Sequence, residues 1–411
     1  MATVTAFPTA FPLQAVSTSH LRALCRVLWD WHLCDNCRNP TNNRWQCQTD
    51  GCPWEEKTMY GRLELFFDLY RELTRAYVPD FFGDEDQALR GHHDLFDIML
   101  LLKTHGATLT RDECRAIYFA HRGTKGGPLT IARADQDRAF DLASRVMTMA
   151  AVAGGSLESQ RRLRVFRSGD DDESGARFLD PHWRADQSLS VALSDLFPMR
   201  IHPSLQDGDA LVERIKADLT AVNLTRIAGL RMEGTNDLKN HLRLNQATGV
   251  VHVFHMTTVL KEHLLASRLA HTAACLPRHI ALETLYTIQL LFQQDDKSRA
   301  LHRNLVSKHG FDPDGLRFGT VPYESPGERD SASRFPIWGP RLMDLYDEIE
   351  NPKPRGVVDA WLERRSKSRH VMMATIAGVI AAVILGVLTL CVSVFQTWIS
   401  WQQWKGQAAA G

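Results

Sequence analysis

The longest uninterrupted apolar stretch of the chain runs through residues 371–395, VMMATIAGVIAAVILGVLTLCVSVF. It contains no charged residue. At about 1.5 Å per residue it makes a helix about 37 Å long, enough to cross a hydrocarbon core of about 30 Å with some tilt. A buried soluble helix is the competing interpretation, but core helices seldom run this far without a charged or amide side chain. The pattern predicts one transmembrane helix.

The residues on either side of this span predict its orientation. Four basic residues precede it, namely Arg364, Arg365, Lys367 and Arg369, whereas Lys405 is the only basic residue after it. Basic flanks stay in the cytosol, so the large N-terminal part of the chain is expected there and the residues after the span across the membrane. Trp398, Trp401 and Trp404 follow the span, where indole rings gather at lipid headgroups. The lipid bilayer is therefore the first predicted partner.

The start of the chain does not have the pattern of a secretory signal. Residues 1–20 contain no Lys or Arg, and Pro8 and Pro12 interrupt the stretch that would form the apolar centre of such a signal. A spanning helix followed by a short tail predicts tail anchoring. We therefore expect an integral, single-pass protein that is inserted after synthesis, with an endomembrane as its destination.

Small residues recur every fourth position within the predicted span. They are Ala374, Gly378, Ala382 and Gly386. Such a stripe lets two helices approach closely and predicts a homodimer that packs through the membrane helix. The alternative is that Ala and Gly are simply frequent in spanning helices.

Four of the eight cysteines form a cluster near the N-terminus. They are Cys34, Cys37, Cys47 and Cys52, with the spacing C-x2-C-x9-C-x4-C. Two close pairs let four thiolates converge on one zinc ion, so the sequence predicts a structural zinc. Two disulfides would suit an oxidising compartment, and a redox CxxC would follow a strand rather than the helical pattern seen here. Four unrelated buried cysteines are the plainest alternative.

The rest of the chain shows mainly the pattern of amphipathic helices. Apolar residues recur at helical spacing in 94–105, 134–153 and 277–292, whereas β-branched residues predict a short strand near 250–255. The predicted fold class is mainly α, with two helical domains, a short β element, a small Cys-rich module and one transmembrane helix. In chain order we expect a flexible N-terminus (1–20), a Cys-rich zinc module (21–58), a helical domain (59–155), a charged linker (156–178), a second mainly helical domain (179–350), a basic juxtamembrane segment (351–370), the transmembrane helix (371–395) and a short tail (396–411).

Composition and motifs give little support to a catalytic function. The 48 basic residues balance the 48 acidic ones, so nucleic acid is not an expected partner. The sequence has no Walker loop, GxGxxG, GxSxG or HExxH motif. The leading hypothesis is a cytosolic helical interaction module for a protein partner, held on a membrane. The alternatives are an enzyme with a site between the helical domains, around His252 and His255, and a membrane-tethered regulator that binds nucleic acid through residues 94–123.

Several segments resemble a family of proteins from filamentous fungi. The resemblance lies in GVVHVFHMTTVLKEHL, HGFDPDGLRF, RLMDLYDEIENPKPRG, WLERRSKSRHVMMAT and VSVFQTWISWQQW, and more loosely in DQDRAFDLASRVMTMA. It covers the C-terminal half of the chain well and the remainder thinly. It implies a fungal source and a single C-terminal span, and it brings no activity, cofactor or catalytic residue with it.

Overall fold

The computed structural model divides into two units. It describes residues 11–38, 47, 49, 51–55, 61–79, 86–122, 131–152, 183–206, 209–269, 274–316, 328, 334–352 and 369–408. The first unit, here called the compact unit, extends to Pro352, and the second begins at Lys353. Each unit is described by itself.

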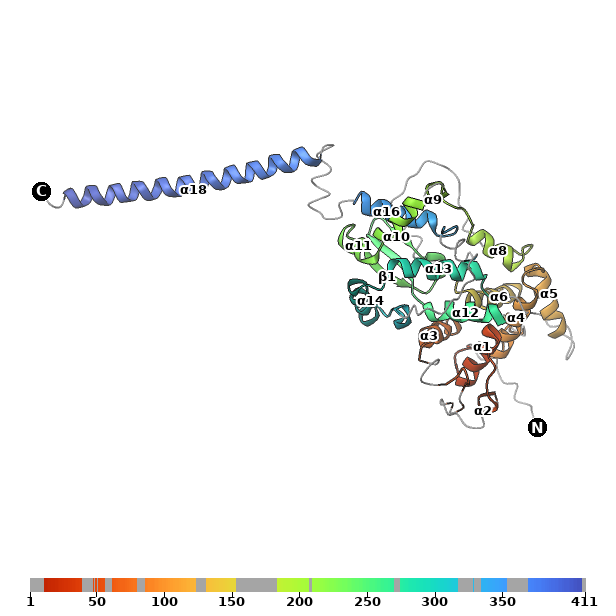
Figure 1. Ribbon diagram of the computed structural model, residues 1–411. Helices are drawn as coiled ribbons and strands as arrows, with labels where there is room; N and C mark the ends of the chain where they lie inside the picture. The colour runs from red at the N-terminus through yellow and green to blue at the C-terminus, as the bar shows by residue number, and fades with distance from the viewer. Residues whose placement is uncertain are drawn as a thin grey trace, which may run out of the picture. The chain divides into compact units, whose positions relative to one another are not determined.

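The compact unit is mainly helical, as the sequence predicts (Figure 1). Its α-helices are α1 (Thr18–Trp29), α2 (Asp35–Arg38), α3 (Glu64–Arg75), α4 (His92–His105), α5 (Arg111–Arg122), α6 (Arg133–Thr148), α8 (Leu189–Leu196), α9 (Pro203–Gln206), α10 (Asp209–Asp218), α11 (Ala221–Arg226), α12 (Thr257–Leu269), α13 (Arg278–Leu291), α14 (Asp296–His309) and α16 (Gly339–Glu350). Two 3-10 turns, η3 (Leu238–Asn240) and η4 (Pro313–Leu316), complete the helical elements described.

Helix α1 shows how the sequence determines these elements. Its N-cap, Ser17, accepts a hydrogen bond from the backbone N–H of His20, whose ring accepts one from the backbone of Ser17 in return. This reciprocal cap satisfies N–H groups that the first helical turn leaves without partners. Leu21, Leu24 and Leu28 recur at helical spacing and are buried. The helix therefore starts at a polar cap and presents one apolar face to the core.

A three-stranded sheet replaces the single strand expected from the sequence. Strand β3 (Val250–Phe254) confirms the predicted β element and lies in the centre, between β1 (Arg231–Thr235) and β2 (Arg243–Asn245). It pairs parallel to β1 and antiparallel to β2. The pattern of β3 is visible because four of its five residues are apolar and buried. Strand β1 has the sequence RMEGT with one buried residue, so hydrophobicity alone did not reveal it.

One continuous core runs through the compact unit, which differs from the predicted division into separate domains. It extends in sequence from Leu13 to Tyr346 and includes residues of both predicted helical domains and of the Cys-rich segment. Helix α1 contacts both α4 and α12, so apolar faces that the sequence assigns to different domains cover one another. Within the segment expected to be flexible, Leu13 is fully buried and α1 begins at Thr18; residues 1–10 lie outside the described part.

The described residues on either side of the predicted charged linker are hydrogen-bonded to one another. The backbone N–H of Trp183 donates a hydrogen bond of 2.8 Å to the carbonyl of Val152. Residues 156–178 themselves are outside the described residues. The chain therefore enters and leaves the undescribed stretch at neighbouring points of the compact unit.

The second unit contains the apolar helix predicted from the sequence. Helix α18 (Arg369–Ala408) is 40 residues long, so it includes the predicted span and continues to Ala408 through residues expected as a short tail. Among the described residues, one stretch, Gly378–Lys405, is long and apolar enough to cross a membrane, and none of its apolar window is buried. The small residues of the stripe lie on this helix, and a Cβ added at Gly378 or Gly386 would meet nothing within 4 Å.

Candidate metal centre

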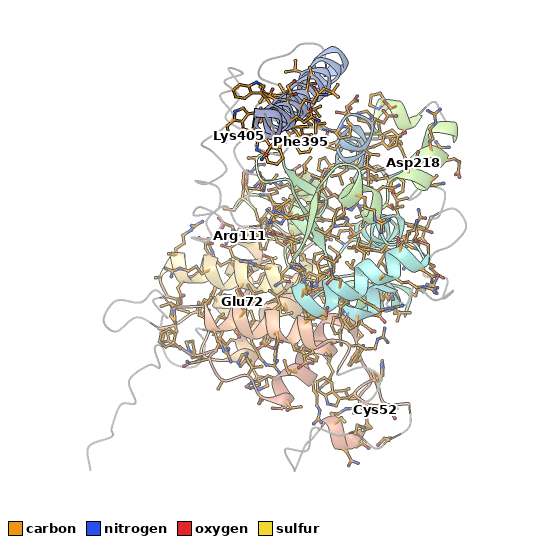
Figure 2. All side chains as sticks on the ribbon, turned by 90° about the vertical axis from the view of Figure 1, so that its left-hand side faces the viewer. Cys52, Glu72, Arg111, Asp218, Phe395 and Lys405 are labelled. Carbon is orange, nitrogen blue, oxygen red and sulfur yellow. The ribbon has the colours of Figure 1, made fainter. Side chains whose placement is uncertain are left out.

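The four cysteines predicted to bind zinc come together in space. The Sγ atoms of Cys34, Cys37, Cys47 and Cys52 all lie within 4.8 Å of one another. The Sγ atoms of Cys34 and Cys47 are 3.5 Å apart. Zinc bound tetrahedrally by thiolates at about 2.3 Å requires neighbouring sulfur atoms about 3.8 Å apart. The separations bracket this value, so the four thiols have the arrangement that a structural metal requires. Figure 2 shows Cys52 near the lower edge of the view.

The first pair of cysteines is positioned by the turn between α1 and α2. Helix α1 ends at Asp30, whose backbone is in the left-handed region. Cys34 follows, and its carbonyl accepts hydrogen bonds from the backbone N–H groups of Cys37 and Arg38, at 3.0 and 2.9 Å. This turn directs Cys37 inward, where its side chain is 3% exposed. The short C-x2-C spacing thus places both sulfur atoms on one side of a tight turn.

A buried lysine holds the start of this turn. Lys103 of α4 donates hydrogen bonds to the carbonyls of Val27 and Leu28, at 3.0 and 3.3 Å, and pairs with Asp30 at 2.6 Å. Its ammonium group satisfies carbonyls that the last turn of α1 leaves without partners and favours the negative end of the helix dipole. Lys103 therefore fixes the point at which the chain turns from α1 towards the cysteines.

The segment that contains Cys52 is packed against helix α1. The backbone N–H of Cys52 donates to the carbonyl of Thr49, and the carbonyl of Cys52 accepts from the N–H of Glu55. Trp54 follows immediately and is fully buried. The guanidinium of Arg22 lies 5.2 Å from the centre of the Trp54 ring, a favourable cation–π arrangement. The module is thereby attached to α1 by packing as well as by the chain itself.

An aromatic chain connects the module to α12. The rings of Trp54 and Trp31 are 6.5 Å apart, and the indole N–H of Trp31 donates to Glu262 at 3.3 Å. Burial raises the pKa of Glu262 to about 7, against the opposing effects of the Trp31 hydrogen bond and of Arg62. The cysteine module is therefore in direct contact with residues more than 200 positions away in the sequence.

The thiols of the cluster differ in their readiness to lose a proton. Burial raises the pKa of Cys37 and of Cys52. Burial acts in the same direction on Cys34, but hydrogen bonds from Thr49 and from neighbouring groups prevail and lower its pKa to about 6. Cys34 is also the one member of the cluster that is not fully buried.

The histidines considered for an enzymatic site lie in and beside the small sheet. The Nε2 atom of His255 is 3.0 Å from the Oδ1 atom of Asn236, and burial lowers the pKa of His255 to about 4. The ring also fills the space above Gly234, where a Cβ atom would lie 2.8 Å from it. His252 is partly buried at the centre of the sheet, opposite Glu233 and Arg243. Neither side chain lines the pocket described next.

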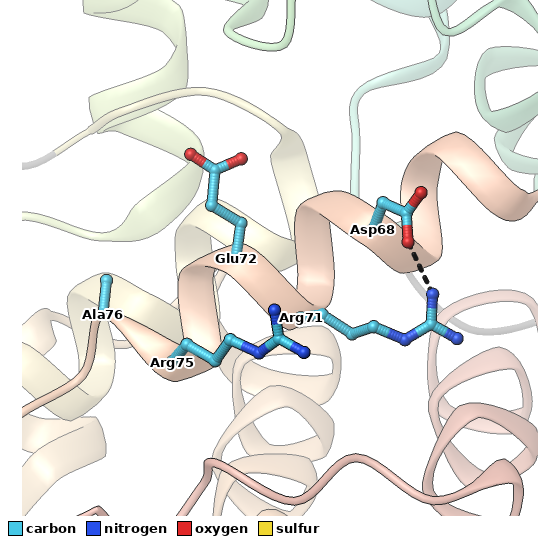
Figure 3. Close-up of a pocket in the computed structure, with 5 residues that line it drawn as sticks. All are labelled: Asp68, Arg71, Glu72, Arg75 and Ala76. Carbon is cyan, nitrogen blue, oxygen red and sulfur yellow. Dashed lines mark hydrogen bonds and ion pairs between the residues drawn. The ribbon is translucent and has the colours of Figure 1, made fainter.

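A hollow of about 540 Å³ lies on α3, and it differs from a catalytic cleft (Figure 3). Asp68, Arg71, Glu72, Arg75 and Ala76 line it. Asp68 and Arg71 form an ion pair of 2.6 Å within the helix. Two acidic and two basic side chains from successive turns of one helix are the usual composition of a solvated helix surface.

Two arginines of the segment considered for nucleic-acid binding, Arg111 and Arg115, are engaged inside the compact unit. Arg111 is 7% exposed, lies over the ring of Trp183 and pairs with Asp141 at 2.7 Å. Arg115 is also buried and pairs with Asp112 and Asp137. The side chains of His121 and Arg122 are outside the described residues. The described arginines of α5 therefore hold the fold together, and their charges are neutralised by carboxylates.

A buried ionic network is a feature that the sequence did not reveal. Lys261 and Asp314 form an ion pair of 2.6 Å, with side chains 3% and 4% exposed, and Arg62 pairs with the second oxygen of Asp314. The sequence does contain a trace of this network, because Lys261, Glu262 and His263 follow one another on α12 and are buried together with their apolar neighbours. Because charged residues are usually exposed, such a run is normally assigned to a solvated face.

No family model, no curated protein and no solved structure matches the chain. The resemblance to proteins of filamentous fungi stays a prediction. Helix α18 and the four cysteines are the features of the chain that bear on its function.

Proposed function

We propose that this chain is a membrane-anchored interaction protein. Its compact unit is stabilised by a structural zinc ion and faces the cytosol. The observation that supports this most strongly is the pairing of an unburied apolar helix with four convergent thiols in a single chain. The exposed apolar surface of α18 requires a lipid environment, whereas four free thiols require a reducing compartment. The cytosolic surface of an internal membrane satisfies both requirements.

Helix α18 supports the anchoring part of the proposal. Its apolar window has a mean hydropathy of 2.7, and none of it is covered by other residues. Exposed apolar surface of this extent is unfavourable in water, whereas hydrocarbon accommodates it. Lys405 lies 4.0 Å from the ring of Trp401, an arrangement suited to the headgroup region. The helix is thus compatible with a tail anchor.

The cysteine cluster supports a structural rather than a catalytic metal. Cys34, Cys37, Cys47 and Cys52 would supply all four ligands of a tetrahedral zinc ion, which leaves no coordination position for water or substrate. The segment between Cys37 and Cys52 is too short for a hydrophobic core of its own, so a metal would supply the missing stability. The bound ion would hold Trp54 and Trp31 against α1 and α12.

Metal analysis of the full-length protein in mild detergent tests the zinc site. We expect about one zinc ion per chain, and a loss of most of it in Cys37→Ser and Cys47→Ser. Cys391→Ser is the matched control, because this cysteine lies on α18 and is exposed outside the cluster. Equal metal content in all four proteins would refute the site.

The orientation of the anchor requires a test that does not use the natural glycosylation sequon. Asn223-Leu-Thr225 lies in α11, and the side-chain amide of Asn223 donates to the carbonyl of Asp218 at 2.8 Å. A sequon held in a helix is a poor acceptor whichever side it faces. A flexible sequon appended after Gly411 is the better reporter. We expect it to be glycosylated in microsomes while added protease digests the compact unit; a protected compact unit would refute the orientation.

Self-association through α18 is the second part of the proposal. Ala374, Gly378, Ala382 and Gly386 would form the contact between two copies. Gly378→Ile and Gly386→Ile together are expected to abolish crosslinked dimers in lipid vesicles, because the bulky side chains separate the helices. Val379→Ile and Val387→Ile are matched controls one position away. If dimers persist when both glycines are replaced, the stripe is not the interface.

A further inference from the structure

The cysteine cluster contains one pair that is better placed for oxidation than the other thiols. Cys34 is partly exposed, whereas Cys37, Cys47 and Cys52 are 3%, 8% and 7% exposed. The Sγ atom of Cys47 lies 3.5 Å from that of Cys34, within a cluster whose sulfur atoms all lie within 4.8 Å of one another. Exposure decides which thiol an oxidant reaches first, and a second thiol at this distance decides what happens next.

We propose that Cys34 and Cys47 form an oxidative modification site, at which a peroxide produces a disulfide and releases the metal. The inference rests on the proposed zinc site. The four cysteines are equivalent as zinc ligands but differ in this reaction. Cys34 reacts with the oxidant, and Cys47 then forms the disulfide with it. The two remaining cysteines alone cannot bind zinc tightly.

The chemistry balances with hydrogen peroxide as the oxidant. The thiolate of Cys34 attacks one peroxide oxygen, the O–O bond breaks, hydroxide leaves, and Cys34 becomes a sulfenic acid. The thiolate of Cys47 then attacks this sulfur, the S–S bond forms, the S–O bond breaks, and a second hydroxide leaves. The two sulfur atoms have together lost the two electrons that the peroxide gained. Two equivalents of a small thiol reverse the reaction through a mixed disulfide.

The positions of the neighbouring elements indicate what oxidation changes. Cys34 forms the turn into α2, and Cys47 lies on the segment that leads to Cys52 and Trp54. A disulfide keeps the two segments together but removes the central ion that holds all four sulfur atoms. We expect the packing of Trp54 against Arg22 to loosen while α1 and α4 stay folded, because Lys103 holds the end of α1 independently of the cysteines.

Peroxide titration of the zinc-loaded, full-length protein in detergent tests this inference. Zinc content is measured first, release is followed with a zinc-sensitive dye, and the disulfide is mapped by mass spectrometry after alkylation. Two variants keep four ligands: Cys34→His and Cys52→His. We expect wild type and Cys52→His to release zinc at rates within about threefold of each other, and Cys34→His to be slower by at least about tenfold.

The outcomes separate the two proposals. A protein that contains no zinc before peroxide is added refutes the metal site, and the modification site with it. A zinc-loaded protein that releases its metal without a Cys34–Cys47 disulfide, or a Cys34→His variant as fast as wild type, overturns the modification site alone. Restoration of zinc binding by a small thiol completes the supporting result.

Discussion

The buried ion pair between Lys261 and Asp314 offers the sharpest test of how the compact unit is stabilised. Their charged atoms are 2.6 Å apart and almost fully shielded from water. Lys261→Met replaces the ammonium group with an apolar group of similar length, and Asp314→Asn replaces the carboxylate with a neutral amide of the same shape. The double variant removes both charges.

The surroundings of the pair predict the order of these effects. Asp314 also pairs with Arg62 at 3.2 Å, so its carboxylate keeps one cation in Lys261→Met. In Asp314→Asn two cations face a neutral amide. Removing one partner of a buried pair costs about 3–5 kcal/mol, so we expect about 4 kcal/mol for Asp314→Asn and about 2 kcal/mol for Lys261→Met. The double variant should lose less than the sum by about 2 kcal/mol or more, because neither buried charge remains from the pair.

Urea denaturation of the full-length protein in detergent, followed by tryptophan fluorescence, measures these free energies. Lys216→Met is the matched control, since Lys216 forms an ion pair with Glu213 of similar length, 2.8 Å, but with side chains 38% and 70% exposed. We expect it to cost less than about 1 kcal/mol. Additive costs in the double variant, or equal costs for the buried and exposed lysines, would refute this reasoning.

Three further predictions concern other parts of the compact unit. Lys103→Met should lower the unfolding free energy by about 3 kcal/mol and weaken zinc binding, because it removes the group that holds the turn before Cys34; unchanged metal affinity would contradict the second part. Burial raises the pKa of Glu283 to about 7 although its carboxylate accepts N–H groups of Ile337 and Trp338, so stability is retained at acid pH and lost as the pH rises from about 4.5 through 7. Glu283→Gln, which cannot ionise, should therefore have a higher unfolding free energy than wild type at pH 8, by on the order of 3 kcal/mol at most; urea denaturation at pH 8 and pH 5 measures this, with no such gain expected at pH 5. Replacing residues 154–181 with about six Gly and Ser residues should leave stability unchanged or raise it by about 1 kcal/mol, because Val152 and Trp183 already meet; a thermal melt that falls sharply would show that the segment contributes packing.

The features that the sequence predicted are those encoded by neighbouring residues. The long apolar helix α18 follows from its uninterrupted apolar run, and the cysteine cluster follows from two short spacings. The helices and β3 follow from local periodicity. In each case the signal lies within one element and does not depend on what packs against it.

The features that the sequence did not predict depend on contacts between distant residues. Periodicity shows that α1 has an apolar face, but not that α4 and α12 share it, so the predicted domains became one core. For the same reason, the sequence did not reveal the partners of Lys261 and Glu262. Asp314, the partner of Lys261, lies on η4, and Trp31, the partner of Glu262, lies beside the cysteine cluster. Strand β1 exists because β3 pairs with it, and its own residues carry little hydrophobic signal.

The uninterrupted length of α18 limits how it can sit in a bilayer. Its 40 residues span about 60 Å, whereas a membrane with its headgroups is about 40–45 Å thick. An upright helix would project roughly 15–20 Å into water, and a helix with both ends at the headgroups would tilt by about 40–50° from the membrane normal. In the upright case, the part of the helix beyond the headgroups forms a rigid extension that moves with the membrane. In the tilted case, the bilayer thickness determines the tilt angle, and a thinner membrane gives a larger tilt.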